Sequence, residues 1–137
     1  MDLEIKIKQG IGDVKFGSVT DETTAILGQP SDTEIIDDGF GQPITVAHYD
    51  EAGLSLFFEG TDKQLKCIDI SNEDATLFGE KIFQKNERDI VKLLVSNKLY
   101  EQDIENEAWG ERRVTFADAN IDLFFADDKL QSVSIGR

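Results

Sequence analysis

A short apolar stretch occurs twice in this chain, and the repetition limits the folds that the chain can adopt. Residues Leu54–Phe58 read Leu-Ser-Leu-Phe-Phe, and residues Ile121–Phe125 read Ile-Asp-Leu-Phe-Phe 67 positions later. In both stretches large apolar residues occupy every second position, which is the pattern of a β-strand with one buried face. The same shift aligns Phe16 with Phe83 without a gap. The sequence therefore indicates an internal duplication.

The duplication predicts one domain, residues 1–137, made of two repeats that run over about 1–71 and 72–137. Each repeat is expected to contain one helix followed by a meander of three antiparallel strands. The predicted fold class is α+β: two tandem helix-plus-three-stranded-meander repeats that form one antiparallel sheet with the helices on one face.

Local signals place the elements of these repeats. Ser18 or Thr20 is expected to cap the first helix, and Gly28 to end it. Asn86 is expected to cap the second helix, which extends from Glu87 to about Ser96. A short strand around 33–36 is compatible with the sequence, and the first meander is predicted to comprise Ile44–Tyr49, Leu54–Glu59 and Leu65–Ile70.

A short motif in the first repeat points to a known family. Phe16–Gly17 is followed by Asp21–Glu22, and the helix ends in Ile26–Pro30, which reads Ile-Leu-Gly-Gln-Pro. This arrangement resembles the repeat unit of the β-lactamase inhibitor protein (BLIP) family and of the related small SmpA/OmlA-type outer-membrane-assembly lipoproteins. The second repeat departs from the motif, with Gln84 in place of the glycine and Val95–Asn97 in place of the Gly-x-Pro stop. The resemblance implies a binding scaffold and no particular partner.

Strand alternation predicts which face of the sheet is open. Leu54, Leu56 and Phe58 are the larger apolar set of their strand, so they should face the helices. Phe57 and Phe124 must then point out of the opposite face at equivalent places. We predict a protein-binding face there, because aromatic and arginine side chains are enriched in such surfaces. Its predicted members are Phe57, Phe124, Trp109, His48, Arg113, Val46 and Asp69. Burial of the same face in a homodimer, a loop over the aromatic residues and an incorrect alternation remain alternatives.

The charge of the chain restricts its partners. Lys and Arg number 14 against 28 Asp and Glu, which gives a net charge of −14. Such a chain is unsuited to nucleic acid and to anionic membranes, whereas a basic protein partner would be attracted. The single cysteine, Cys67, and the absence of a leader-like N-terminus favour a cytoplasmic protein, with a removed signal peptide as the alternative.

No arrangement of residues in the sequence matches a catalytic, metal or cofactor site. His48 is the only histidine, and a Cys67–His48 pair has no evident third group to orient it. Carboxylate pairs such as Glu59 and Asp69 arise by chance in so acidic a chain. We therefore expect no enzyme, no metal and no cofactor, and predict a non-catalytic protein-binding module of the inhibitor or immunity type. The alternatives are a structural or envelope-assembly module, a homodimer that buries the same face, and a small-ligand carrier.

Overall fold

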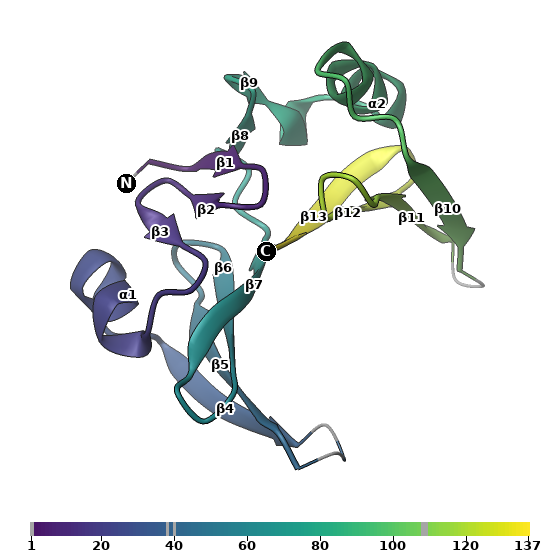
Figure 1. The fold of residues 1–137 in the computed structure, drawn as a ribbon. Coiled ribbons are helices and arrows are strands. Elements are labelled where there is room, and N and C mark those ends of the chain that lie inside the picture. The colour runs from purple at the N-terminus through teal and green to yellow at the C-terminus, as the bar shows by residue number, and fades with distance from the viewer. Residues whose placement is uncertain (1, 38, 40, 108–109) are drawn as a thin grey trace.

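The structure, a computed structural model, describes residues 2–37, 39, 41–107 and 110–137 and is mostly β. These residues form thirteen strands in two sheets, together with two α-helices and one turn of 3-10 helix. The larger sheet has eight strands and the smaller has five (Figure 1).

The eight-stranded sheet is antiparallel throughout and has the order β10-β11-β12-β13-β7-β6-β5-β4. Two consecutive four-stranded meanders are joined where β7 pairs with β13, with Asp69 opposite Ser134. The strands are β4 (Asp32–Asp37), β5 (Pro43–Tyr49), β6 (Leu54–Glu59), β7 (Gln64–Ile70), β10 (Gln102–Asn106), β11 (Glu111–Phe116), β12 (Ile121–Ala126) and β13 (Lys129–Gly136).

The five-stranded sheet connects the two halves of the chain and has the order β3-β2-β1-β8-β9. In its centre β1 pairs in parallel with β8, and the Glu4 carboxylate accepts hydrogen bonds from the Thr76 hydroxyl and from the Gly79 backbone N–H. Gly12 turns the chain between β2 and β3 with φ of 55°, and a Cβ there would lie 2.2 Å from the Asp2 carbonyl oxygen. The strands are β1 (Glu4–Lys6), β2 (Gly10–Ile11), β3 (Val14–Lys15), β8 (Thr76–Leu77) and β9 (Glu80–Lys81).

The two helices differ in how the backbone groups at their ends are hydrogen-bonded. Helix α2 (Glu87–Ser96) follows a 3-10 turn, η1 (Ile82–Gln84), and the Asn86 side chain accepts the Asp89 backbone N–H at 2.9 Å, as predicted. Helix α1 (Thr20–Leu27) ends at Gly28 as predicted, with φ of 83°. The predicted Ser18 or Thr20 cap is wrong, because Val19 occupies the N-cap position and its N–H is accepted by the Glu22 side chain instead.

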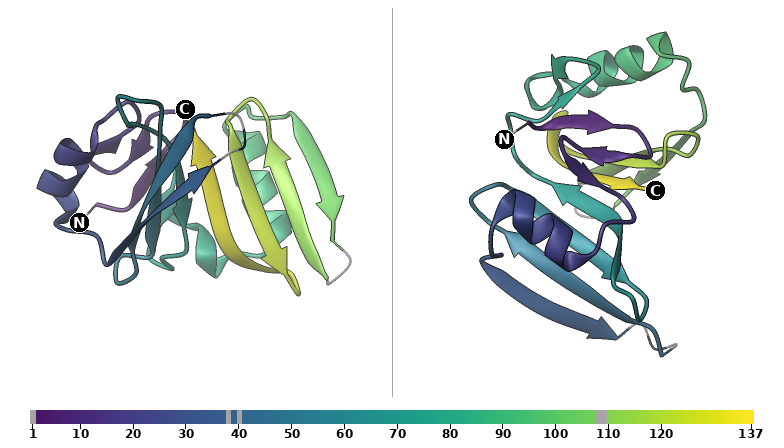
Figure 2. Two further views of the ribbon diagram at one scale, coloured as in Figure 1. Left: turned by 90° about the horizontal axis from the view of Figure 1, so that it is seen from below. Right: turned by 60° about the vertical axis from the view of Figure 1, so that its left-hand side comes forward.

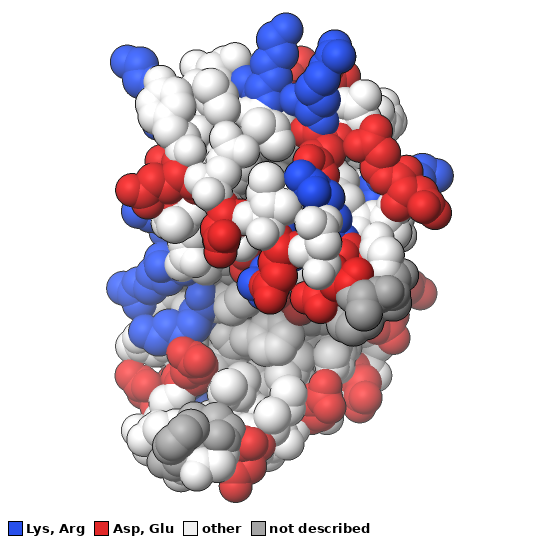
Figure 3. Space-filling model, turned by 90° about the vertical axis from the view of Figure 1, so that its right-hand side faces the viewer, with Lys and Arg blue, Asp and Glu red and all other residues white. Residues whose placement is uncertain are grey.

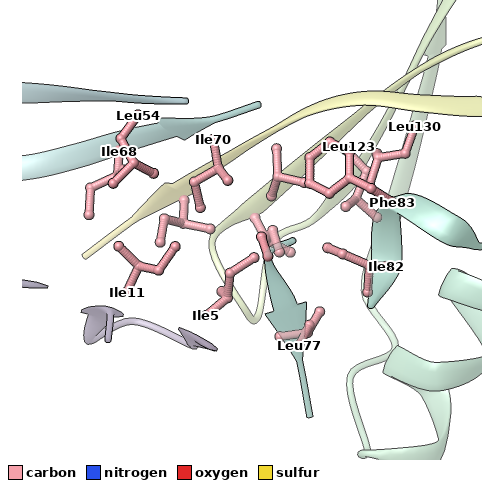
Figure 4. Close-up of a cluster of buried hydrophobic side chains, with 14 of the residues drawn as sticks. Ile5, Ile11, Leu54, Ile68, Ile70, Leu77, Ile82, Phe83, Leu123 and Leu130 are labelled. Carbon is pink, nitrogen blue, oxygen red and sulfur yellow. The ribbon is translucent and has the colours of Figure 1, made fainter. Parts of the chain in front are cut away.

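The main core lies between the two sheets. Figure 4 shows apolar side chains from the large sheet, such as Ile68 and Leu123, packed toward Ile5 and Leu77 of the small sheet and toward η1. Figures 1 and 2 show the large sheet bent, with both helices and the small sheet on its convex side. Among the described residues, no helix or strand lies on the concave side.

The predicted fold class is wrong in its architecture. The chain is mostly β with two sheets, and not an α+β fold of two helix-plus-three-stranded-meander repeats with one sheet. Each meander has a fourth strand. β4 coincides with the short strand considered around 33–36, whereas β10 was not predicted, because its residues are all exposed and show no apolar alternation. The two-residue strands of the small sheet are too short for a periodic signal. The division of the chain into two repeats stays a prediction.

Candidate binding face

A row of polar side chains crosses the concave face of the large sheet at one level. The strand registers place these residues side by side, because residues directly opposite each other in antiparallel strands point to the same face. From β4 to β10 the row is Asp32, His48, Ser55, Asp69, Ser134, Asp122, Thr115 and Asp103. Every strand of the sheet therefore contributes one polar residue.

Hydrogen bonds link neighbours along this polar row. The ring nitrogens of His48 contact Ser55 Oγ at 2.9 Å and Glu34 Oε1 at 2.8 Å. In the other half of the row the Thr115 hydroxyl donates to the Asp122 carboxylate. These side chains thus hold one another in place, which reduces the entropy that a partner would have to remove on binding.

Asp69 lies near the middle of the row, and its surroundings disfavour the ionised form of its carboxyl group. Withdrawal from water by the neighbouring strands raises the pKa of Asp69, and the nearby Asp122 carboxylate raises it further. A hydrogen bond from Ser134 and the proximity of His48 act in the opposite direction. A cation placed against this point would favour the ionised form of Asp69.

Cys67 lies beside Asp69 on the same face of β7. Its Sγ is 3.4 Å from Ser134 Oγ, and burial raises the pKa of the Cys67 thiol, with smaller contributions from neighbouring carboxylates. A thiol held protonated in this way is a poor nucleophile. A Cys67–His48 pair has no support from the contacts, because the two His48 ring nitrogens are bonded to Ser55 and Glu34.

On one side of the polar row, Phe57 packs over an apolar patch. Phe57 is partly buried and stands opposite Val46 of β5 and Cys67 of β7. Val46 is fully buried, yet it does not belong to the main core cluster. The concave face therefore has a small apolar layer of its own, in which Phe57 and its neighbours cover Val46.

On the other side of the row, Phe124 occupies the corresponding place in β12. It is partly buried and stands between Arg113 of β11 and Ser132 of β13. Arg113 forms an ion pair with Glu105 of β10. Counting three strand spacings and four residues along the strands, Phe57 and Phe124 would be about 20 Å apart on a flat sheet.

The seven residues predicted for this face thus have different outcomes. Five of them lie on the concave face. His48 and Asp69 belong to the polar row, Phe57 lies on one side of it, and Phe124 and Arg113 lie on the other side. Val46 shares that face but is fully buried, so it supports Phe57 and is closed to a partner. Trp109 lies outside the described residues. Strand alternation also directs Ser134 and Asp122 to this face, but it does not show that they meet in one row, which follows from the strand register. Glu34 was not predicted, and its place follows from its contact with His48.

Charged side chains surround this face. Figure 3 views the molecule from the side on which the sheet bends inward, and acidic groups outnumber basic ones around a recessed, mostly uncharged area below the middle of the view. A shallow depression beside the row is lined by residues that include Ser55, Asp69 and Ser132. The face is therefore concave, partly apolar and bordered by negative charge.

The described part of the chain lacks a metal-binding cluster and a membrane-spanning helix. Among these residues, no three His, Cys, Asp or Glu side chains gather in a way that would hold a metal ion. Neither helix in the described ranges is long and apolar enough to cross a membrane.

Comparison with known proteins identifies the fold but no family. No family model and no curated protein matches the chain. Among solved structures, the uncharacterized protein yfeY from Escherichia coli is similar over 100% of both chains, with a TM-score of 0.61 and 13% identity. An extracellular protein containing an SCP domain from Bacillus anthracis is similar over 95% of this chain and 49% of that chain, with a TM-score of 0.49 and 14% identity. The likeness to yfeY extends over the whole chain and shows a shared fold.

Proposed function

We propose that this chain is a non-catalytic protein-binding module, of the inhibitor or immunity type, that binds a basic partner on the concave face of its large sheet. The observation that carries the proposal is the arrangement of Phe57 and Phe124 on either side of a hydrogen-bonded polar row. Partly buried aromatic residues next to fixed polar groups have the composition of interface hot spots.

The spacing of the two aromatic residues favours a protein over a small ligand. A standard protein interface buries about 800 Å² on each partner, which is a patch roughly 30 Å across. Two anchors about 20 Å apart fit within one such patch. A drug-sized molecule would reach only one of them.

The charge of the face favours a basic partner. Asp69 and Asp122 stand on either side of Ser134 in the row, and the pKa of Asp69 is raised mainly by its withdrawal from water and further by the Asp122 carboxylate. Lysine or arginine from a partner would relieve this repulsion and speed association through the field of the acidic chain. The resemblance of the Phe16–Pro30 motif to the β-lactamase inhibitor family also supports a binding role.

The test is affinity capture from the native organism with three immobilised proteins. These are the wild type, the Phe57→Ala/Phe124→Ala double variant, and Tyr100→Ala as a control, since Tyr100 is a 61% exposed aromatic residue. The proposal expects a partner that is captured by the wild type and the control and is lost with the double variant. Equal capture by all three proteins would refute the role of the face.

Burial of the face in a homodimer is tested with the wild type and a Phe57→Asp variant. Analytical ultracentrifugation at nanomolar concentration distinguishes the two outcomes. A wild-type dimer that dissociates in Phe57→Asp would assign the face to self-association and overturn the proposal.

A further inference from the structure

The strand β4 presents a free edge at one end of the large sheet. It is the terminal strand in the sheet order, pairs with β5 on one side, and is exposed at all six residues. No strand among the described residues pairs with its other side, as Figure 1 shows. In an antiparallel strand, every second residue directs both its N–H and its C=O toward one edge. β4 therefore offers a regular set of backbone donors and acceptors to an additional strand.

Of the usual protections of an edge strand, β4 has only its acidic side chains. Its pairing with β5 runs without a bulge from Asp32 opposite His48 to Asp37 opposite Pro43. The strand contains neither proline nor lysine, which proteins commonly use to block unwanted pairing. It exposes Ile35 to 71% and Ile36 to 41%. Only its acidic residues limit the partners that it can accept.

The surrounding segment carries most of the net negative charge of the chain. Residues 16–62 contain ten Asp and Glu and no Lys or Arg, so this segment carries −10 of the net −14. The rest of the chain contains 18 acidic and 14 basic residues, which is −4. Two copies of β4 pairing with each other would bring three acidic residues from each strand together without a cation. A second copy of this chain is therefore an unfavourable occupant, and a cationic strand is a favourable one.

The two faces of β4 select different side chains. Asp32 and Glu34 point to the concave face, where they stand opposite His48 and Val46. Thr33 and Ile35 point to the convex face, and Thr33 lines a cavity of about 310 Å³ between α1 and the β4–β5 pair. An added strand would thus meet carboxylates on one face, and an exposed isoleucine beside a threonine-lined cavity on the other.

We propose that β4 accepts an additional antiparallel strand from an extended, cationic segment of another protein. Lysine or arginine side chains of that segment lie against Asp32 and Glu34, and small apolar side chains lie against Thr33 and Ile35. Backbone hydrogen bonds supply affinity, and the alternation of basic and apolar residues supplies specificity. This docking edge is separate from the aromatic anchors of the concave face, so either proposal can fail without the other.

The strand β10 at the opposite end of the sheet is an internal control. It is also exposed at every residue. However, its Glu105 is paired with Arg113, and its Asn106 accepts a hydrogen bond from Arg112. An arginine of the chain itself therefore already pairs with a carboxylate of β10, whereas Glu34 of β4 contacts a histidine ring, so a basic strand gains less at β10.

The experiment uses an acetylated and amidated eight-residue peptide of alternating lysine and valine, at low ionic strength. Binding is measured by fluorescence anisotropy, and amide hydrogen exchange is measured by NMR with and without peptide. We expect exchange to slow at alternate amides of β4 and to stay unchanged at β10. The Asp32→Lys/Glu34→Lys variant should bind the peptide at least tenfold more weakly, and Phe57→Ala/Phe124→Ala should bind it as the wild type does.

A peptide with methylated backbone nitrogens on its pairing edge separates strand addition from simple charge attraction. It keeps the same charge but cannot donate to β4, so its binding should be at least tenfold weaker. The proposal is overturned if both peptides bind equally, if β4 exchange is unchanged, or if the lysine–valine peptide does not bind. It is also overturned if the protein alone forms a dimer that protects β4.

Discussion

Phe57 and Phe58 are neighbours in β6 that face opposite sides of the large sheet, so alanine at each position tests whether the concave face is free. Phe58 is fully buried in the main core. Its truncation leaves a closed cavity, and Phe58→Ala should therefore destabilise the protein by about 3 to 5 kcal/mol. Phe57 is partly exposed and covers Val46 from the concave side. Phe57→Ala loses only part of a phenylalanine burial energy and leaves no closed cavity, so about 1 to 2 kcal/mol is expected.

The assay is urea unfolding of both variants and the wild type, followed by circular dichroism and analysed with a shared slope. Thermal unfolding of the same proteins is the second measurement. At roughly 4 °C per kcal/mol, the melting temperature should fall by about 12 to 20 °C for Phe58→Ala and by about 4 to 8 °C for Phe57→Ala. Equal destabilisation by the two substitutions would refute the reasoning, because Phe57 would then be a core residue. In that case the concave face would no longer offer it as an anchor for a partner.

Three further predictions concern stability and reactivity. The raised pKa of Asp69 means that the folded protein binds this proton more tightly than the unfolded chain, so the ionised carboxylate costs stability at neutral pH. Asp69→Asn should thus raise the urea midpoint at pH 7, by an amount that shrinks as the pH falls through the raised pKa toward the ordinary value of 3.8; a lowered midpoint at pH 7 would contradict this. Burial and the resulting rise in pKa should make Cys67 react with iodoacetamide more slowly in the native protein than in urea at the same pH, and equal rates would be inconsistent with the structure. Asn86→Ala removes the acceptor for the Asp89 N–H and should lower the unfolding free energy by about 1 kcal/mol, measured by the same urea titration; no change would show that the cap is dispensable.

Sequence periodicity predicted the elements that have one buried face. The predicted strand Leu54–Glu59 and the predicted helix from Glu87 to Ser96 coincide with β6 and α2. In both elements the burial alternates with the period of the secondary structure, so the apolar pattern was visible in the residues alone. The cap at Asn86 was predictable for the same kind of reason, since it depends on residues three positions apart.

The architecture was not predictable from these local signals. Strand β1 pairs with β8, with Glu4 opposite Thr76, and no local pattern indicates a contact across so many residues. The strands of this small sheet are two or three residues long. The four two-residue strands therefore give no period, and the sequence predicts one sheet instead of two.

The same distinction applies to the binding face: some of its features follow from the sequence and others only from the tertiary structure. Residue alternation placed Phe57 and Phe124 on one face, because a strand turns successive side chains to opposite sides. Only the tertiary structure decided that Val46 is buried beneath its neighbours and that Asp69, Ser134 and Asp122 stand in one row. The sequence by itself determined which residues could be inside and which outside, through the period of each strand. The register between strands, set by packing and hydrogen bonds over long separations, decided which of the outward residues meet.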